Sequence, residues 1–208
     1  MALSEKQRQK KLAKKTAKRK ERLLDKKSTG ELGAKINQSS LMSSPIHECL
    51  ISETLFDMGM GHVIISRRVS GDRIGFCMFL LDVYCLGVKN AFASTVTMAE
   101  YERKIVHSGI NQFVDIQCAC AVKLVEDAVA YAKGLGFSPQ KDYGGAKKIF
   151  GDINPKDCST EYTFGKDGKP YFITGPHDTL ATCKKIMDTL TKSCGSDGFH
   201  FTAPVFEG

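Results

Sequence analysis

The chain is organised around a hydrophobic stretch from His62 to Leu86, in which two apolar runs flank Ser70-Gly71-Asp72-Arg73. A Gly-Asp pair between two such runs is typical of a tight turn, so the pattern predicts a β-hairpin. The second run, 74–86, is apolar at nearly every position instead of at alternate positions. It therefore predicts a strand that is buried on both faces, in the interior of a sheet.

Five segments combine helical periodicity with start or stop signals. Ser44-Pro45 resembles an N-cap followed by proline at the first helical position, and Thr97-Met-Ala-Glu100 matches a capping box. The predicted helices cover 45–58, 97–109, 116–135, 139–150 and 179–194, with Asp115 and Asp178 as caps of the third and the last.

The remaining segments complete the predicted fold. Residues 87–95 are expected to form an irregular connection, whereas EYTF and YFIT, on either side of the turn sequence at 165–170, predict a second hairpin. Hairpins that are segregated from runs of helices indicate an α+β fold. We therefore expect an antiparallel sheet built from two hairpins, packed by about five helices, with a basic N-terminal extension.

Charge and composition divide the chain into two predicted parts. Residues 1–27 contain twelve Lys or Arg and three acids, a balance of +9, so the other 18 basic and 20 acidic residues give −2. Residues 28–44 are polar and contain Gly and Ser, which is typical of a linker. We predict a basic arm and linker at 1–44 and a single globular domain at 45–208.

The basic arm predicts binding to nucleic acid, with RNA ahead of DNA and a ribosome as one setting. Lysines that neutralise phosphates release counterions, which strengthens binding without reading sequence. The arm has no aromatic residue for stacking, so it should supply affinity and not specificity. A solubilising or targeting extension is the simpler alternative, since KKTAKRK also matches a nuclear-localisation pattern. The predicted phosphate contacts are Lys10, Lys11, Lys14, Lys15, Lys18, Arg19, Lys20 and Arg22.

Asp82 interrupts the apolar run and needs a partner, because burying an unpaired carboxylate is costly. Arg67, Arg68 and Arg73, in the facing strand and the turn, are its predicted partners. A lone buried acid is more often structural than catalytic.

A metal-assisted hydrolase, specifically a nuclease, is the second functional hypothesis. Asp82, Glu100, Asp115 and His107 would then converge on a divalent cation. A simpler explanation exists for three of them, because Glu100 belongs to a capping box, Asp115 is a predicted cap and His107 lies near a helix end. We therefore predict neither a catalytic residue nor a metal ligand, and no cofactor.

The eight cysteines are predicted to stay reduced in the cytoplasm, because no apolar signal segment follows the N-terminal charges. A nuclear location fits a eukaryotic source. Cys118 and Cys120 would lie on different sides of a helix, so they cannot readily bind one zinc ion. Cysteines in apolar stretches behave as small hydrophobic residues. This applies to Cys77, Cys85, Cys118, Cys120 and Cys183.

A protein-interaction module, such as a partner from a bacterial accessory system, is the third hypothesis. Under this hypothesis the same α+β body binds a protein instead of a nucleic acid. No apolar run reaches the length of a membrane span, so we expect no membrane insertion.

Overall fold

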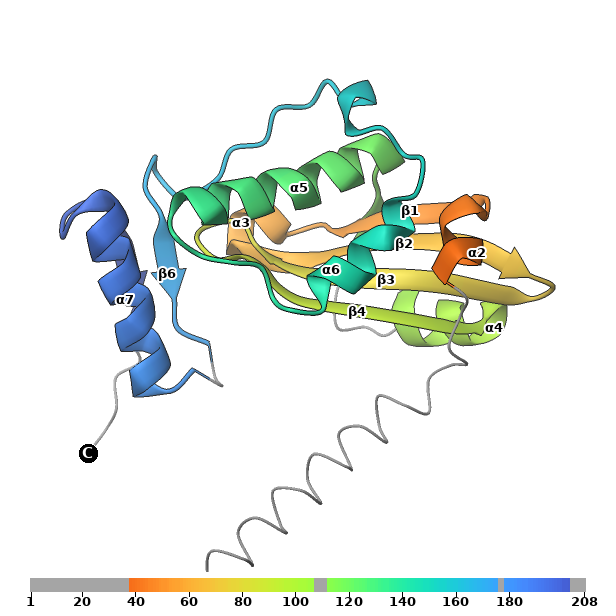
Figure 1. The fold of residues 1–208 in the computed structure, drawn as a ribbon, viewed down its shortest axis with the longest axis horizontal. Coiled ribbons are helices and arrows are strands. Elements are labelled where there is room, and N and C mark those ends of the chain that lie inside the picture. The colour runs from red at the N-terminus through yellow and green to blue at the C-terminus, as the bar shows by residue number, and fades with distance from the viewer. Residues whose placement is uncertain (1–37, 107–111, 176–177, 203–208) are drawn as a thin grey trace, which may run out of the picture. The chain divides into compact units, whose positions relative to one another are not determined.

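Five antiparallel strands form the main sheet of the computed structural model (Figure 1). They are β1 (Ile46–Ser52), β2 (Met60–Ser70), β3 (Arg73–Asp82), β4 (Gly87–Thr97) and β5 (Phe113–Asp115). Their order in the sheet is β4-β3-β2-β1-β5. The structure describes residues 38–106, 112–175 and 178–202, which all belong to a compact unit of residues 36–208. The α+β class with an antiparallel sheet is thus confirmed.

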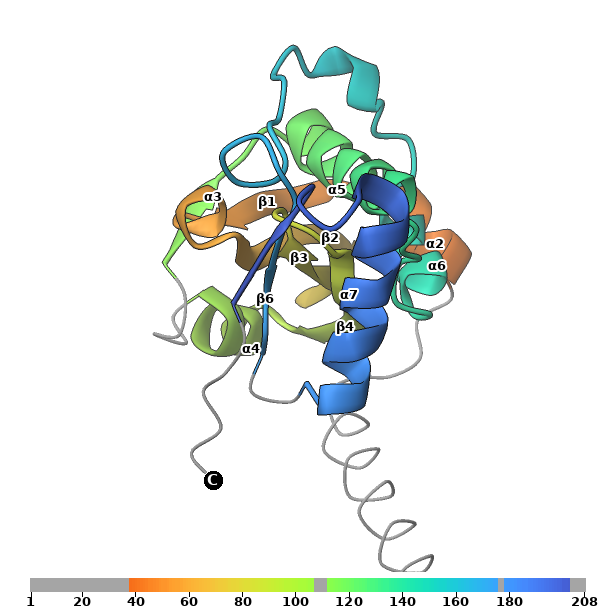
Figure 2. The same cartoon turned by 90° about the vertical axis from the view of Figure 1, so that its left-hand side faces the viewer.

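Helices lie on both faces of this sheet, and a second small sheet lies beside α7 (Figure 2). The α-helices are α2 (Gln38–Ser43), α3 (Leu55–Met58), α4 (Met98–Tyr101), α5 (Cys118–Gly134), α6 (Tyr143–Ala146) and α7 (Leu180–Cys194). Short helical turns are η1 (Glu102–Val106), η2 (Lys147–Phe150) and η3 (Pro155–Asp157). The second sheet pairs β6 (Tyr171–Ile173) with β7 (His200–Thr202) in parallel.

The predicted central hairpin is confirmed as β2 and β3. Ser70 pairs with Arg73 across a turn in which Gly71 has a φ of +55°, a left-handed conformation that glycine adopts without strain. Both strands are interior, because β3 also pairs with β4 and β2 with β1. This position explains why the second run is apolar on both faces.

The two faces of the hairpin pack against different helices. Val63 and Phe79 belong to a core cluster that includes Val125 of α5. Phe76 alternates to the other face, where its ring lies 5.5 Å from that of Tyr101 in α4. α5 and α4 therefore cover opposite faces (Figures 1 and 2).

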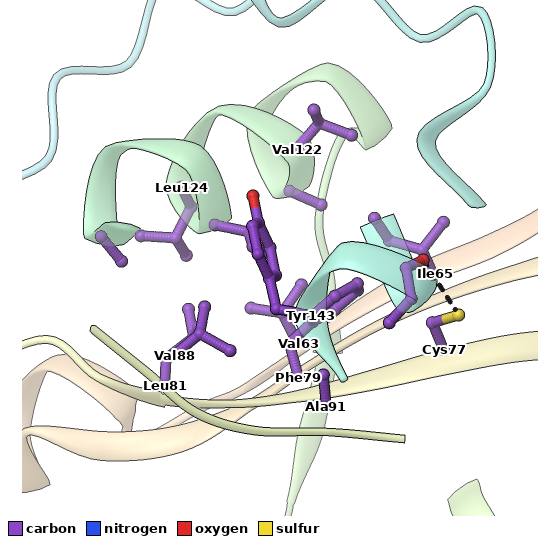
Figure 3. Packing of buried hydrophobic residues seen from close by; sticks show 14 of the residues in the cluster. Val63, Ile65, Cys77, Phe79, Leu81, Val88, Ala91, Val122, Leu124 and Tyr143 are labelled. Atoms are coloured by element: carbon purple, nitrogen blue, oxygen red, sulfur yellow. Dashed lines mark hydrogen bonds between the residues drawn. The ribbon is translucent and has the colours of Figure 1, made fainter. Parts of the chain in front are cut away.

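α6 completes the cover on the α5 side. Figure 3 shows Tyr143 between α5 and the sheet, and its ring centroid lies 6.2 Å from that of Phe79. The Cys77 thiol donates a hydrogen bond of 3.3 Å to the carbonyl oxygen of Ala146. The predicted helix at 139–150 is thus present only as α6 and η2.

The predicted helix at 45–58 and the irregular connection at 87–95 are both wrong. Residues 46–52 form β1, which pairs with β2 on one side and β5 on the other, and only α3 is helical. Cys49 and Leu50 are buried at 3% and 5% exposure although they point to opposite faces. Because both faces of β1 are covered, its residues do not alternate between apolar and polar as they would in a strand with one exposed face. Residues 87–97 form β4 along the free side of β3.

The predicted second hairpin is also wrong, although its turn is present. Lys166 and Lys169 form an isolated antiparallel bridge, but 161–164 is not a strand. β6 pairs instead with β7, so its partner comes from beyond α7. The helices α5 and α7 are confirmed, but their N-caps are Gln117 and Thr179 and not Asp115 and Asp178.

Arg67 joins three segments inside the body. It is only 2% exposed and donates hydrogen bonds to the carbonyl oxygens of Ser44, Ile149 and Phe150, at 2.6, 2.8 and 2.8 Å. A fourth bond of 3.2 Å reaches the carboxylate of Asp152. Through these contacts β2 fixes both the start of β1 and the end of η2. Leu41 of α2 is also part of the main core.

Replacing Arg67 by Met should lower the free energy of unfolding by about 2–5 kcal/mol, because three buried carbonyl groups lose their donor. Urea denaturation followed by circular dichroism measures this change. Arg68→Met is the matched control, since Arg68 is exposed in the same strand, and it should change the value by less than about 0.5 kcal/mol. Equal effects of the two substitutions would contradict the role given to Arg67.

Candidate functional site

The basic residues predicted to contact phosphates, from Lys10 to Arg22, lie outside the described residues, as does His107. Glu100 is where the sequence predicted it, in a capping box at the start of α4. The Thr97 side chain accepts the backbone N–H of Glu100, and the Glu100 carboxylate accepts the backbone N–H of Thr97, each at 3.3 Å. Its capping role is thus confirmed.

Asp82 ends β3 and shapes the connection to β4. It is 3% exposed, and its Oδ1 accepts the backbone N–H groups of Tyr84 at 3.1 Å and of Cys85 at 2.8 Å. Burial raises the pKa of the Asp82 carboxyl to about 6, and Lys89 and the backbone N–H groups limit the rise. The carboxylate thus closes a backbone turn.

The arginine partners predicted for Asp82 are wrong. Arg67 directs its guanidinium to backbone carbonyls and to Asp152 on another part of the body, while Arg68 and Arg73 are exposed. Lys89 is the cation whose charge acts on Asp82. The hairpin register explains the difference, because Asp82 pairs with Met60 at the end far from the turn. Arg67 and Arg68 instead pair with residues 75 and 74, close to the turn.

The predicted metal-binding carboxylates do not form a cluster in the described part of the chain. Glu100 caps α4, Asp115 lies on the exposed strand β5, and Asp82 lies at the β3–β4 turn. Among the described residues, no group of three or more His, Cys, Asp or Glu side chains is arranged to hold a metal ion.

The expectation that all cysteines stay reduced is wrong for one pair. Cys120 of α5 and Cys158, directly after η3, form a disulfide across 38 residues. Both are buried, at 6% and 5% exposure. The bond ties the loop after α6 to the first turn of α5. No spacing pattern predicts this bond, because the two cysteines come from separate segments.

A cation and three aromatic rings meet at the second sheet. The Nζ atom of Lys166 lies 5.9 Å from the ring centroid of Tyr84 and 5.5 Å from that of Tyr171. The two tyrosine rings stack at 6.0 Å, and the His200 ring lies edge-on to Tyr171 at 6.4 Å. We call Lys166, Tyr171 and His200 the Tyr171 surface.

The backbone holds this surface in place. Tyr171 and His200 are register partners in the parallel pair β6–β7, and their side chains share one face of it. Tyr84 supports the surface from beneath, since its hydroxyl donates to the carbonyl oxygens of Phe56 and Asp57 at 2.8 and 2.9 Å. Lys166 and His200 are exposed, and Tyr171 is half-buried.

Sequence reasoning did not single out these residues as a site. The available signal was the alternation of aromatic residues and lysines in Tyr162–Tyr171, which was assigned to a hairpin. His200 had no such signal, because it reaches Tyr171 only through the β6–β7 pairing.

No family model, no curated protein and no solved structure matches the chain. The described helices include none that is both long enough and apolar enough for a membrane crossing.

The Asp82 carboxyl predicts a defined pH dependence of stability. Its pKa is about 6 in the folded state and 3.8 in the reference state, so the folded protein holds the proton more tightly and loses stability as the pH rises through about 6. The free energy of unfolding of the wild type, relative to Asp82→Asn, should fall by about 2 kcal/mol between pH 4 and pH 7. Urea denaturation of both proteins across this range measures the difference. A difference that does not vary with pH would contradict the assignment.

Proposed function

We propose that the protein binds RNA, with its lysine-rich arm on the phosphates and the Tyr171 surface on the bases. The observation that carries the proposal is the separation of charge. The arm at 1–27 has a balance of +9, whereas the rest of the chain is close to neutral at −2. An arm of this kind supplies electrostatic affinity for any polyanion.

The Tyr171 surface supports the proposal by providing what the arm lacks. Single-stranded RNA is bound through bases that stack on aromatic rings, next to cations that contact the backbone. His200 offers an exposed ring, and the exposed Lys166 lies above the neighbouring Tyr171. A second exposed lysine, Lys169, donates to the backbone carbonyl of Asp197 at 2.9 Å and holds the turn against the loop after α7.

The geometry gives less support to the other two hypotheses. A metal-assisted nuclease requires convergent ligands, and the described residues contain no such group. The two N–H groups on Oδ1 also give Asp82 a structural role. A protein-interaction module remains the second candidate, because Phe56 and Met58 of α3 and Val114 of β5 are exposed large apolar side chains.

Removing residues 1–27 should abolish most of the RNA affinity, because the arm holds the predicted phosphate contacts. For the full chain, eight contacts on single-stranded RNA predict a slope of roughly −6 in a plot of log K against log salt concentration. Fluorescence anisotropy with a labelled RNA at several salt concentrations measures both quantities. The truncated protein should show a slope of about −1 or shallower, since Lys166 is the only lysine of the Tyr171 surface. If it binds with the slope of the full chain, the role of the arm is contradicted.

Replacing His200 by Ala should weaken RNA binding by about 1–3 kcal/mol, the loss of one stacked base, and leave the salt slope unchanged. Phe201→Ala is the matched control, since Phe201 is 50% exposed but alternates to the opposite face of β7. It should leave the affinity unchanged. Equal losses from both substitutions would exclude a specific role of the Tyr171 surface. A co-purifying protein that survives ribonuclease treatment would favour the interaction module.

A further inference from the structure

Two further cysteines lie in direct contact next to the Cys120–Cys158 disulfide. The Sγ atoms of Cys49 in β1 and Cys118 in α5 are 2.7 Å apart, well inside the van der Waals separation of two sulfur atoms, and both residues carry free thiols. Sulfur atoms this close need only a small shift to reach bonding distance.

The backbone holds the two thiols together. The Ile116 N–H donates to the Cys49 carbonyl oxygen at 3.0 Å, and Leu50 pairs with Asp115 in the β1–β5 ladder. The chain therefore leaves β5 against β1 and enters α5 directly, with Cys118 as its first residue. The contact spans 69 residues of sequence, so the fold and not local sequence creates it.

The two thiols differ in access. Cys49 is 3% exposed, whereas Cys118 is half-buried. Burial and, after it, the contact with Cys118 raise the pKa of the Cys49 thiol above its ordinary value. A small reagent therefore reaches Cys118 first, and Cys49 keeps its proton until its neighbour has reacted.

We propose that Cys49 and Cys118 are a redox-active dithiol that small-molecule disulfides, such as glutathione disulfide, oxidise to an intramolecular disulfide. This site is independent of RNA binding.

The reaction consists of two thiol–disulfide exchanges. Cys118 loses its proton to solvent and attacks one sulfur of the oxidant RSSR, which forms a Cys118–SR bond and releases RS⁻, which takes up a proton. The Cys49 sulfur then attacks the Cys118 sulfur as its own proton passes to the departing second RS⁻. The protein loses two protons and two electrons overall, and RSSR becomes two RSH.

Oxidation of the full chain from its fully reduced state tests this directly. The protein is equilibrated in glutathione buffers of increasing oxidised fraction and quenched with acid. It is then unfolded in the presence of the alkylating reagent, so that buried thiols also react, and mapped by mass spectrometry. The chain has eight cysteines, so two disulfides should leave four alkylated thiols at full oxidation and a cross-linked peptide pair containing Cys49 and Cys118. Six alkylated thiols, with Cys49 and Cys118 both among them, would overturn the proposal.

Single variants test the order of the two steps. In Cys49→Ser, Cys118 should accumulate one glutathione adduct, because the second thiol is absent, whereas in Cys118→Ser the buried Cys49 should stay unmodified. Cys183→Ser in α7 is the matched control and should form the Cys49–Cys118 disulfide as the wild type does. Native-like circular dichroism establishes that each variant is folded. Equal adducts on Cys49 and on Cys118 in the two variants would exclude the proposed order.

Discussion

Burial of the β2–β3 hairpin on both faces is the constraint that the other elements of the body satisfy. Each face needs its own cover, which α5 supplies on one side and α4 on the other. Both lateral edges also need backbone partners, because unpaired N–H and C=O groups are costly away from water. β1 and β4 provide them. Arg67 of β2 also holds two other segments in place, because its guanidinium donates hydrogen bonds to their backbone carbonyl groups.

The parts of the fold that could be predicted are those that local chemistry determines. The turn at Gly71 and the capping box at Thr97 need only neighbouring residues, and the long helix α5 shows its period over many positions. β1 and β4 were missed for the opposite reason. Their apolar residues match a helix or a loop when taken alone, and only pairing with β2 and β3 makes them strands.

The candidate sites depend even more on contacts between distant segments. Asp82 was correctly singled out as a buried acid, but its partners are backbone N–H groups two and three residues later, which no search among charged side chains finds. Cys120 reaches Cys158, Cys49 reaches Cys118 and His200 reaches Tyr171 through the folded chain alone. The basic arm is predicted from charge density alone, which needs no tertiary structure.

The parallel pairing of β6 with β7 has a consequence for synthesis of the chain on the ribosome. Parallel neighbours require a crossover, here α7, so β6 has no ladder partner until residues 200–202 have been translated. The main sheet uses only residues up to 115 and can assemble much earlier in the nascent polypeptide. A chain that stops translation after β6 would therefore retain its hydrophobic centre but lack the histidine beside Tyr171.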